Sequence, residues 1–227
     1  LRLRSAAACV DITEMRAAAS CGGETALDAI GPYEVLHLAP DSQVKFVASQ
    51  PGLIRTDFGM LNLNADFGLD EVPAPDMVVV PGAPRPDAAM TDTAVLDWLQ
   101  KVHATTTWTT SVCTGALVLG AAGLLNGVRA STHWMAMDAL AEFGARATGE
   151  RVVRDGKIMT AAGVSSGIDM ALTLVAEQWD PATAQGIQLT IEYDPEPPFQ
   201  AGSPAKAPAE IREAVIAQYA ALMEGDG

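Results

Sequence analysis

The sequence predicts an α/β sandwich whose central sheet is mostly parallel. Short apolar, β-branched runs alternate along the chain with longer segments of helical spacing, which is the order expected of strands joined by helical crossovers. The run Met77-Val78-Val79-Val80 is apolar throughout and lies between Pro-Asp and Pro-Gly, as is typical of a strand buried on both faces. A length of 227 residues suits one such domain with a substantial core.

Local patterns in the first half predict four further elements. Residues 44–48 and 107–112 are rich in β-branched and aromatic residues, which favour strands. Residues 93–103 carry apolar side chains at helical spacing and predict an amphipathic helix. Residues 114–123 contain no charged side chain, which indicates a buried helix. Cys113 is therefore expected where a strand becomes a helix.

The second half begins with a predicted hairpin. The stretch Arg151–Thr160 contains two β-like runs that flank Asp155-Gly156, a strong signal for a tight turn between two strands. Residues 165–178 then show helical spacing. Ser165 or Ser166 is expected to cap the first turn of this helix.

The ends of the chain are less regular. Another helix is expected after Asp180-Pro181. Residues 194–208 are too rich in proline for a helix or a central strand, so we expect an extended segment leading to a last helix near Ala209–Met223. Residues 1–25 show no sustained β pattern, although the opening strand belongs there. We predict a single domain over residues 26–227, preceded by an atypical segment of unassigned structure.

The composition limits the classes of partner. With 49% hydrophobic and 19% charged residues, the chain resembles a soluble globular protein. Its formal net charge of -14 disfavours nucleic acid, because like charges repel the phosphate backbone. No run approaches the roughly 18 apolar residues of a membrane span, and acidic residues interrupt the beginning of the chain before an export signal forms. We expect a cytoplasmic protein that binds neither nucleic acid nor membrane.

The cysteines predict neither cross-links nor a metal site. Cys9, Cys21 and Cys113 are odd in number and widely spaced, which fits a reducing compartment better than a disulfide framework or a CxxC metal site. No phosphate loop or dinucleotide fingerprint is present in the sequence. We expect that the protein requires no metal and no cofactor.

Cys113 is the candidate nucleophile because of its place at the start of a helix. The first amides of that helix and its dipole are expected to lower the pKa of the thiol. The stretch Ser111-Val112-Cys113-Thr114-Gly115 resembles a nucleophile elbow, in which Gly115 permits close helix packing. A buried, inert cysteine is the alternative that the residues alone leave open.

Several motifs between about residue 26 and about residue 208 carry a family resemblance. They are Leu27 to Leu36, Thr110 to Leu125, Ala130-Ser131-Thr132-His133-Trp134, Glu150 to Gly156, Gly167-Ile168-Asp169, Gln188-Leu189 with Glu192-Tyr193, and Pro197-Pro198-Phe199 with Ala201-Gly202-Ser203-Pro204. Together they resemble the isonitrile hydratase group of the ThiJ/PfpI-like, class I glutamine amidotransferase-like superfamily. The resemblance implies a flavodoxin-like three-layer sandwich with the cysteine on a nucleophile elbow.

The resemblance also implies an activity. Isonitrile hydratases add water to an isonitrile and give an N-substituted formamide, so Cys113 would attack the terminal carbon and form a covalent thioimidate. Asp28 matches the catalytic carboxylate of the group and would act as general acid and then as base. Burial beside the thiolate is expected to raise the pKa of Asp28. Without the resemblance, a turn or helix-capping role is the simpler interpretation of Asp28.

The remaining candidate site residues surround this pair. Thr114 stands where PfpI-type proteases carry histidine, which implies a hydroxyl hydrogen bond to intermediates in place of a base. Gly82 and Ala83 fall at the Pro-Gly-Gly turn of the family, whose amides can face the substrate as an oxyanion-type site. His133 is the third candidate substrate-binding residue, although a structural role is favoured because Trp134-Met135 follows it rather than the His-x-Glu pattern of class I glutaminases.

Two alternatives belong to other classes. The same motifs occur in the ligand-sensing half of AraC-type regulators, but the acidic last helix before Gly227 leaves no expected DNA-binding part. Other enzymes of the superfamily, such as glyoxalase-like hydratases, deglycases and peptidases, commonly use glutamate at the position of Asp28 or histidine beside the cysteine. Small apolar residues dominate the predicted site, so we expect a small apolar isonitrile-like substrate. The resemblance further implies a homodimer.

Overall fold

The computed structural model describes residues 8–13, 24–57 and 59–224. Most of the N-terminal segment without a predicted structure, including Cys21, lies outside these residues. The chain forms two compact units, of which the first ends at Ile191 and the second begins at Glu192. The extent of one domain over residues 26–227 stays a prediction.

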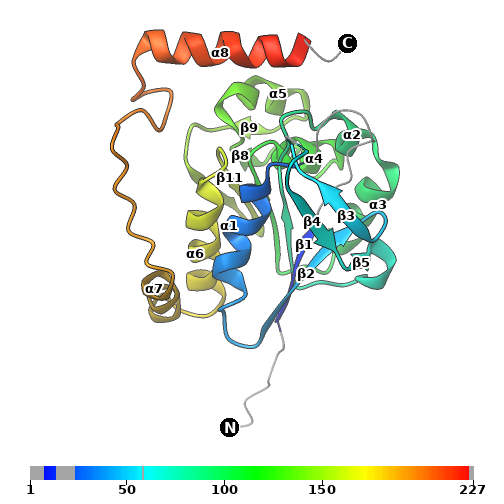
Figure 1. Ribbon diagram of the computed structural model, residues 1–227. Helices are drawn as coiled ribbons and strands as arrows, with labels where there is room; N and C mark the ends of the chain where they lie inside the picture. The colour runs from blue at the N-terminus through cyan, green and yellow to red at the C-terminus, as the bar shows by residue number, and fades with distance from the viewer. Residues whose placement is uncertain (1–7, 14–23, 58, 225–227) are drawn as a thin grey trace. The chain divides into compact units, whose positions relative to one another are not determined.

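The first unit is built on a seven-stranded sheet with the order β10-β11-β7-β6-β1-β2-β5 (Figure 1). All neighbouring strands pair in parallel except β10 and β11. Strand β1 pairs with both β2 and β6, so it supplies the opening strand that no sequence pattern indicated. The strands are β1 Ala8–Thr13, β2 Ser42–Ala48, β5 Phe67–Gly68, β6 Met77–Val80, β7 Trp108–Val112, β10 Val152–Asp155 and β11 Ile158–Ala161.

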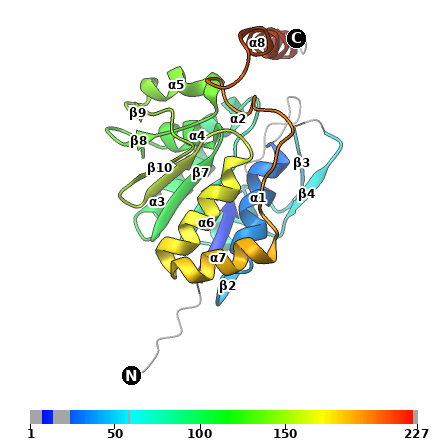
Figure 2. The same cartoon turned by 90° about the vertical axis from the view of Figure 1, so that its left-hand side faces the viewer.

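Helices cover both faces of this sheet (Figures 1 and 2). Met77 and Val79 of β6 join the core beneath α1, α6 and α7, whereas Val78 and Val80 join the core beneath α2, α3, α4 and α5. Because both sets of alternate residues are buried, the apolar run of β6 is continuous, as predicted. The helices are α1 Ala26–Leu36, α2 Asp87–Thr91, α3 Thr93–His103, α4 Gly115–Ala121, α5 Met137–Glu142, α6 Ser166–Gln178 and α7 Pro181–Thr190.

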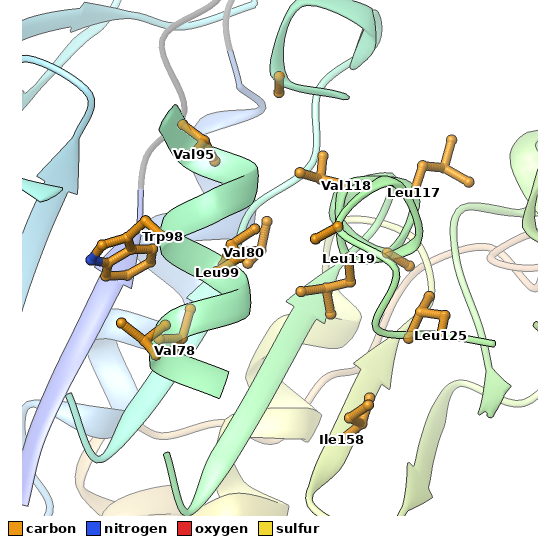
Figure 3. Close-up of a cluster of buried hydrophobic side chains, with 14 of the residues drawn as sticks. Val78, Val80, Val95, Trp98, Leu99, Leu117, Val118, Leu119, Leu125 and Ile158 are labelled. Atoms are coloured by element: carbon orange, nitrogen blue, oxygen red, sulfur yellow. The ribbon is translucent and has the colours of Figure 1, made fainter. Parts of the chain in front are cut away.

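Helix α3 confirms the predicted amphipathic helix (Figure 3). Its residues Val95 and Leu99 are fully buried against the sheet. Trp98 packs beside them and donates a hydrogen bond from its indole nitrogen to the carbonyl oxygen of Val72 (3.0 Å). Asp92 caps the helix, since its carboxylate accepts hydrogen bonds from two amides of the first turn. Apolar burial and a cap therefore fix this helix at the bounds that the sequence predicts.

Strands β10 and β11 form the predicted antiparallel hairpin, in which Asp155 pairs with Ile158. Gly156 takes a φ of +62° in the turn, a conformation that glycine adopts without a steric penalty.

Smaller elements complete the first unit. They are the paired strands β3 Gly52–Arg55 and β4 Asn62–Ala65, the paired strands β8 Arg129–Ala130 and β9 Arg146–Ala147, and the 3-10 helices η1 Leu69–Glu71 and η2 Trp134–Ala136.

The predicted capping of α6 by a serine side chain is wrong. Ser165 precedes the helix with helical backbone angles, and its hydroxyl makes no capping hydrogen bond. That hydroxyl accepts a hydrogen bond from the Arg151 guanidinium instead (3.2 Å). The Ser166 hydroxyl donates to the carbonyl oxygen of Gly163 (2.9 Å). Both serines thus bond to residues that precede the helix rather than to its free amides.

The second unit contains irregular chain followed by one helix, α8 Ala209–Glu224. Residues 194–208 form neither helix nor strand, as their prolines predict. Within this stretch the amides of Lys206 and Ala207 both donate to the carbonyl oxygen of Ser203, which closes a turn. None of the helices described combines the length and the apolar character that crossing a membrane demands.

Candidate active site

Cys113 connects β7 to α4 and has an unusual backbone conformation. Its φ of +57° lies in the left-handed region, which costs about 1 kcal/mol or more for a residue with a Cβ. Its N–H donates to the carbonyl oxygens of Ala161 (3.1 Å) and Ala162 (2.8 Å), and the Thr132 hydroxyl donates to its carbonyl oxygen (2.8 Å). Contacts from two other segments thus hold the residue in this conformation.

Helix α4 begins close to the end of β6 because its first residue is glycine. A Cβ at Gly115 would lie 2.1 Å from the carbonyl oxygen of Val80 and 2.9 Å from that of Pro81. Any larger residue would therefore push the helix away from the strand. The prediction that Gly115 permits close helix packing is confirmed.

The surroundings of the Cys113 thiol favour its protonated form. The side chain is 5% exposed. Burial, and after it the charge of Asp28, raise the pKa of the thiol above its ordinary value, although the amides of Thr114 and Val164 donate toward the sulfur and act in the opposite direction. The predicted lowering of this pKa is wrong, because desolvation outweighs the amides of a helix of only seven residues. Attack on a substrate therefore requires a group that accepts the thiol proton.

Asp28, in the first turn of α1, is the neighbouring titratable group. It is fully buried, and its Oδ2 accepts a hydrogen bond from the amide of Gly82 (3.0 Å). Within the described part of the chain its Oδ1 has no hydrogen-bond partner. Burial raises the pKa of Asp28 to about 8, and the charge of Asp57 contributes in the same direction. The carboxyl is thus neutral at pH 7, as predicted, and bonds to a distant turn rather than to the amides of its own helix.

The raised pKa of Asp28 makes a prediction for stability. The folded protein binds this proton more tightly than the unfolded chain, so this group stabilises the fold fully below about pH 4 and loses that contribution as the pH rises toward about 8. Asp28→Asn removes the titration. We expect the difference in free energy of unfolding, variant minus wild type, to increase as the pH rises from about 4 to about 8. Urea unfolding measures both values. A constant difference across this interval would contradict the assigned pKa.

The turn at Gly82 and Ala83 joins Asp28 to Thr114. The Thr114 hydroxyl donates to the carbonyl oxygen of Ala83 (2.6 Å) and accepts from the Ala83 amide (2.8 Å). The amide of Gly82 donates to Asp28. Both amide protons are thus used within the protein, whereas the sequence predicts that they face the substrate as an oxyanion-type site. The turn positions the carboxyl and the hydroxyl, and substrate binding by Gly82 and Ala83 stays a prediction.

Gly82→Ala is expected to disturb this arrangement. A Cβ would lie 2.5 Å from the Thr114 nitrogen and 2.9 Å from Asp28 Oδ2. We expect a loss of about 1–3 kcal/mol in the free energy of unfolding, as is usual for overpacking. Urea unfolding measures it, with Gly149→Ala as the control, because a Cβ at Gly149 meets nothing within 4 Å. Equal stability of the two variants would contradict the close contact.

His133 lies beside the site without a hydrogen bond to Cys113 or Asp28 among the described contacts. Its Nδ1 accepts the amide of Met135 (3.4 Å), and burial lowers the pKa of the imidazole. A Cβ at Gly163 would come within 2.9 Å of the ring, so the ring packs against the segment that holds Cys113. A neutral, packing histidine fits the structural role, and contact with a substrate stays a prediction.

Two contributors to this region carried no recognisable sequence signal. Val164 acts through its backbone amide, which any residue except proline supplies. Glu24 is 3% exposed and lies before α1, outside the motifs named above. Among the residues that the structure describes, no group of three or more His, Cys, Asp or Glu side chains is arranged to hold a metal ion.

A sequence profile of the DJ-1/PfpI family matches residues 21–177, well over half of the chain. The chain belongs to this family. It is 44% identical to the isonitrile hydratase of Pseudomonas putida over 185 residues, which cover 82% of this chain and 81% of that protein. It is 34% identical to the HTH-type transcriptional regulator CdhR of Pseudomonas aeruginosa over 126 residues, or 55% of this chain and 37% of the regulator.

Solved structures of the DJ-1/PfpI family have the same fold. A ThiJ/PfpI family protein from Pseudomonas syringae superposes with a TM-score of 0.88 at 35% identity, covering 97% of this chain and 89% of that one. DJ-1 from Toxoplasma gondii superposes with a TM-score of 0.71 at 22% identity over 83% of this chain and all of that one, and indicates the fold alone. The match to the regulator is confined to a minor part of that protein, whereas the matches to the Pseudomonas putida hydratase and the Pseudomonas syringae protein extend over most of each.

Proposed function

We propose that this chain is an isonitrile hydratase in which Cys113 forms a covalent thioimidate and Asp28 transfers the protons. The observation that carries the proposal is the pairing of the buried Cys113 thiol with the buried Asp28 carboxyl beside it. The 44% identity to the Pseudomonas putida hydratase supplies the substrate class. The strained junction at Cys113, with glycine two residues later, supports its assignment as a nucleophile elbow.

In the first step the sulfur of Cys113 attacks the terminal carbon of the isonitrile. Asp28 gives its proton to that carbon and accepts the thiol proton, so the carboxyl stays protonated. The new C–S bond and C–H bond turn R–NC into the thioimidate R–N=CH–S. A carboxyl with a pKa of about 8 suits this step, because it holds a proton at neutral pH and can still release it.

In the second step water attacks the thioimidate carbon. Asp28 protonates the nitrogen and takes a proton from the water, which leaves a tetrahedral intermediate bearing OH, H, NHR and sulfur. The C–S bond then breaks as the hydroxyl proton passes through Asp28 to the sulfur of Cys113. The products are the formamide R–NH–CHO and the free thiol. One water is added per turnover, and no net proton is taken up from or released to the solvent.

Thr114 is assigned the role of positioning the Asp28 carboxyl. Its hydroxyl bonds to the N–H and the carbonyl oxygen of Ala83 and so holds the turn whose Gly82 amide donates to Asp28. We expect Thr114→Val to lower kcat about 10-fold with a smaller change in KM, because the carboxyl loses its fixed position. Thr114→Ser should restore the rate. Steady-state kinetics with one isonitrile measure both, and wild-type kcat in the valine variant would contradict the assignment.

The test of the proposed function is the hydration of a simple alkyl isonitrile, with the formamide followed by mass spectrometry. Formamide production by the wild type supports the hydratase. A folded protein without turnover would favour a sensor, as the partial likeness to the regulator suggests, or a hydrolase of different specificity. The folded state is checked by a cooperative thermal transition.

Two further properties belong to the proposal. We expect a homodimer, on the strength of the family resemblance, and light scattering should give twice the chain mass of 23.6 kDa. A cytoplasmic location is expected because the mechanism needs Cys113 as a free thiol, and a reducing compartment preserves it.

A further inference from the structure

Glu24 is a buried carboxyl that the proposed mechanism does not use. It precedes Thr25, whose amide donates to the carbonyl oxygen of Gly82 at the active-site turn (2.9 Å). The side chain is 3% exposed, and neither Oε1 nor Oε2 has a hydrogen-bond partner on another described residue; the backbone amide of Glu24 itself is the donor that lowers the pKa of this carboxyl. Leaving both oxygens of a buried carboxyl without partners is costly, so the position calls for an explanation beyond packing.

Glu24 lines a small pocket of about 10 Å³. Arg85 is the other charged residue of the lining, and the remaining side chains are apolar. These are Pro81, Ala83, Pro86, Ala89 and Val118, the last of which is labelled on α4 in Figure 3. The volume suits a single group the size of a water molecule or a hydroxyl.

The pocket adjoins the candidate active site. Ala83 lines it and bonds through its own N–H and carbonyl to the hydroxyl of Thr114, the neighbour of Cys113. The charge of Asp57 raises the pKa of both Glu24 and Asp28, which places the two carboxyls in one electrostatic neighbourhood. Burial is the largest cause of the raised pKa of Glu24, which is about 7.

We propose that Glu24 is a specificity-determining residue, whose carboxyl binds a hydroxyl group carried on the R chain of the isonitrile. The inference rests on the proposed function and names its substrate class: short isonitriles with a terminal hydroxyl, rather than purely apolar ones.

The chemistry of the pocket selects this group. A hydroxyl donates to a carboxylate and can also accept from a protonated carboxyl, so it satisfies Glu24 in either state. A ring or a branched group exceeds the volume. A terminal methyl would fit but would leave both oxygens of Glu24 without partners.

The test compares n-alkyl isonitriles with analogues in which a hydroxyl replaces the terminal methyl, over a short series of chain lengths. At the length that reaches the pocket, we expect the wild type to favour the hydroxylated substrate by about 10-fold or more in kcat/KM, since one hydrogen bond to a buried charged group has that effect. Glu24→Gln should retain most of the preference. Glu24→Met, which is similar in size and apolar, should abolish or reverse it.

Two controls separate specificity from structure. Glu142→Met replaces an exposed glutamate of α5 and should leave the preference unchanged. Glu24→Met should also raise the melting temperature by about 2–6 °C, because it removes a carboxyl that is buried without partners. A lower melting temperature, or equal kcat/KM for both substrates at every length, would overturn the proposal.

A failure of the hydratase proposal is recognised separately, because then neither substrate gives formamide. In that case the pocket is tested by the rate at which Cys113 is alkylated by N-propyl and N-(2-hydroxyethyl) haloacetamides. Faster reaction of the hydroxylated reagent in the wild type, lost in Glu24→Met, would support the hydroxyl site without hydration. Equal rate ratios in wild type and variant would reject it.

Discussion

Cys113→Ala is expected to lower formamide production by at least about 10⁴-fold, because no other group can form the thioimidate. The fold should persist. Alanine retains the Cβ, so the strain at φ +57° is unchanged, and the hydrogen bonds that hold this position are made by its backbone. Formamide is quantified by mass spectrometry at equal concentrations of folded wild type and variant.

The matched control is Ser111→Ala on the same strand. The Ser111 hydroxyl is buried and has no hydrogen-bond partner in the described chain, so its loss should leave turnover within about 2-fold of the wild type. Turnover in Cys113→Ala close to that of the control would refute the role of Cys113 as nucleophile. Loss of activity in both variants would indicate a general effect of substitution in β7.

Asp28→Asn is expected to lower kcat by about 10²–10⁴-fold, the range in which a positioned proton donor contributes. Asparagine has almost the same shape and can still accept the amide of Gly82, but it carries no transferable proton. Alkylation of Cys113 by iodoacetamide should continue in the variant, because the thiol remains. The rates of hydration and alkylation, measured on the same preparation, separate loss of proton transfer from loss of the site.

The pH profile provides a second measure of Asp28. Because the protonated carboxyl is required, kcat of the wild type should fall as the pH rises through about 8. Asp138→Asn is the control, since Asp138 also lies in the first turn of a helix but is exposed. Wild-type kinetics in Asp28→Asn would return Asp28 to a structural role at the start of α1.

The regular elements were predictable where the signal is local. Strand β6 and helix α3 have the bounds that the sequence predicts, because hydrophobic periodicity and flanking turn residues act over a few positions. The capping of α6 was not predictable from Ser165 and Ser166, because Arg151, on a different element, bonds to one of the two hydroxyls. Strand β1 carries no sustained β pattern and is ordered by pairing with strands on both sides.

The features of the candidate site also fall into those that the sequence predicts and those that only the tertiary structure decides. By itself the sequence determined the α/β order of the chain, the position of Cys113 between a strand and a helix, and the resemblance that singles out Asp28. Only the tertiary structure decided that the thiol pKa is raised, that Gly82 binds Asp28, and that Glu24 is buried without partners. The reason is physical: periodicity lies in neighbouring residues, whereas desolvation and hydrogen bonds between distant segments exist only once the chain has packed.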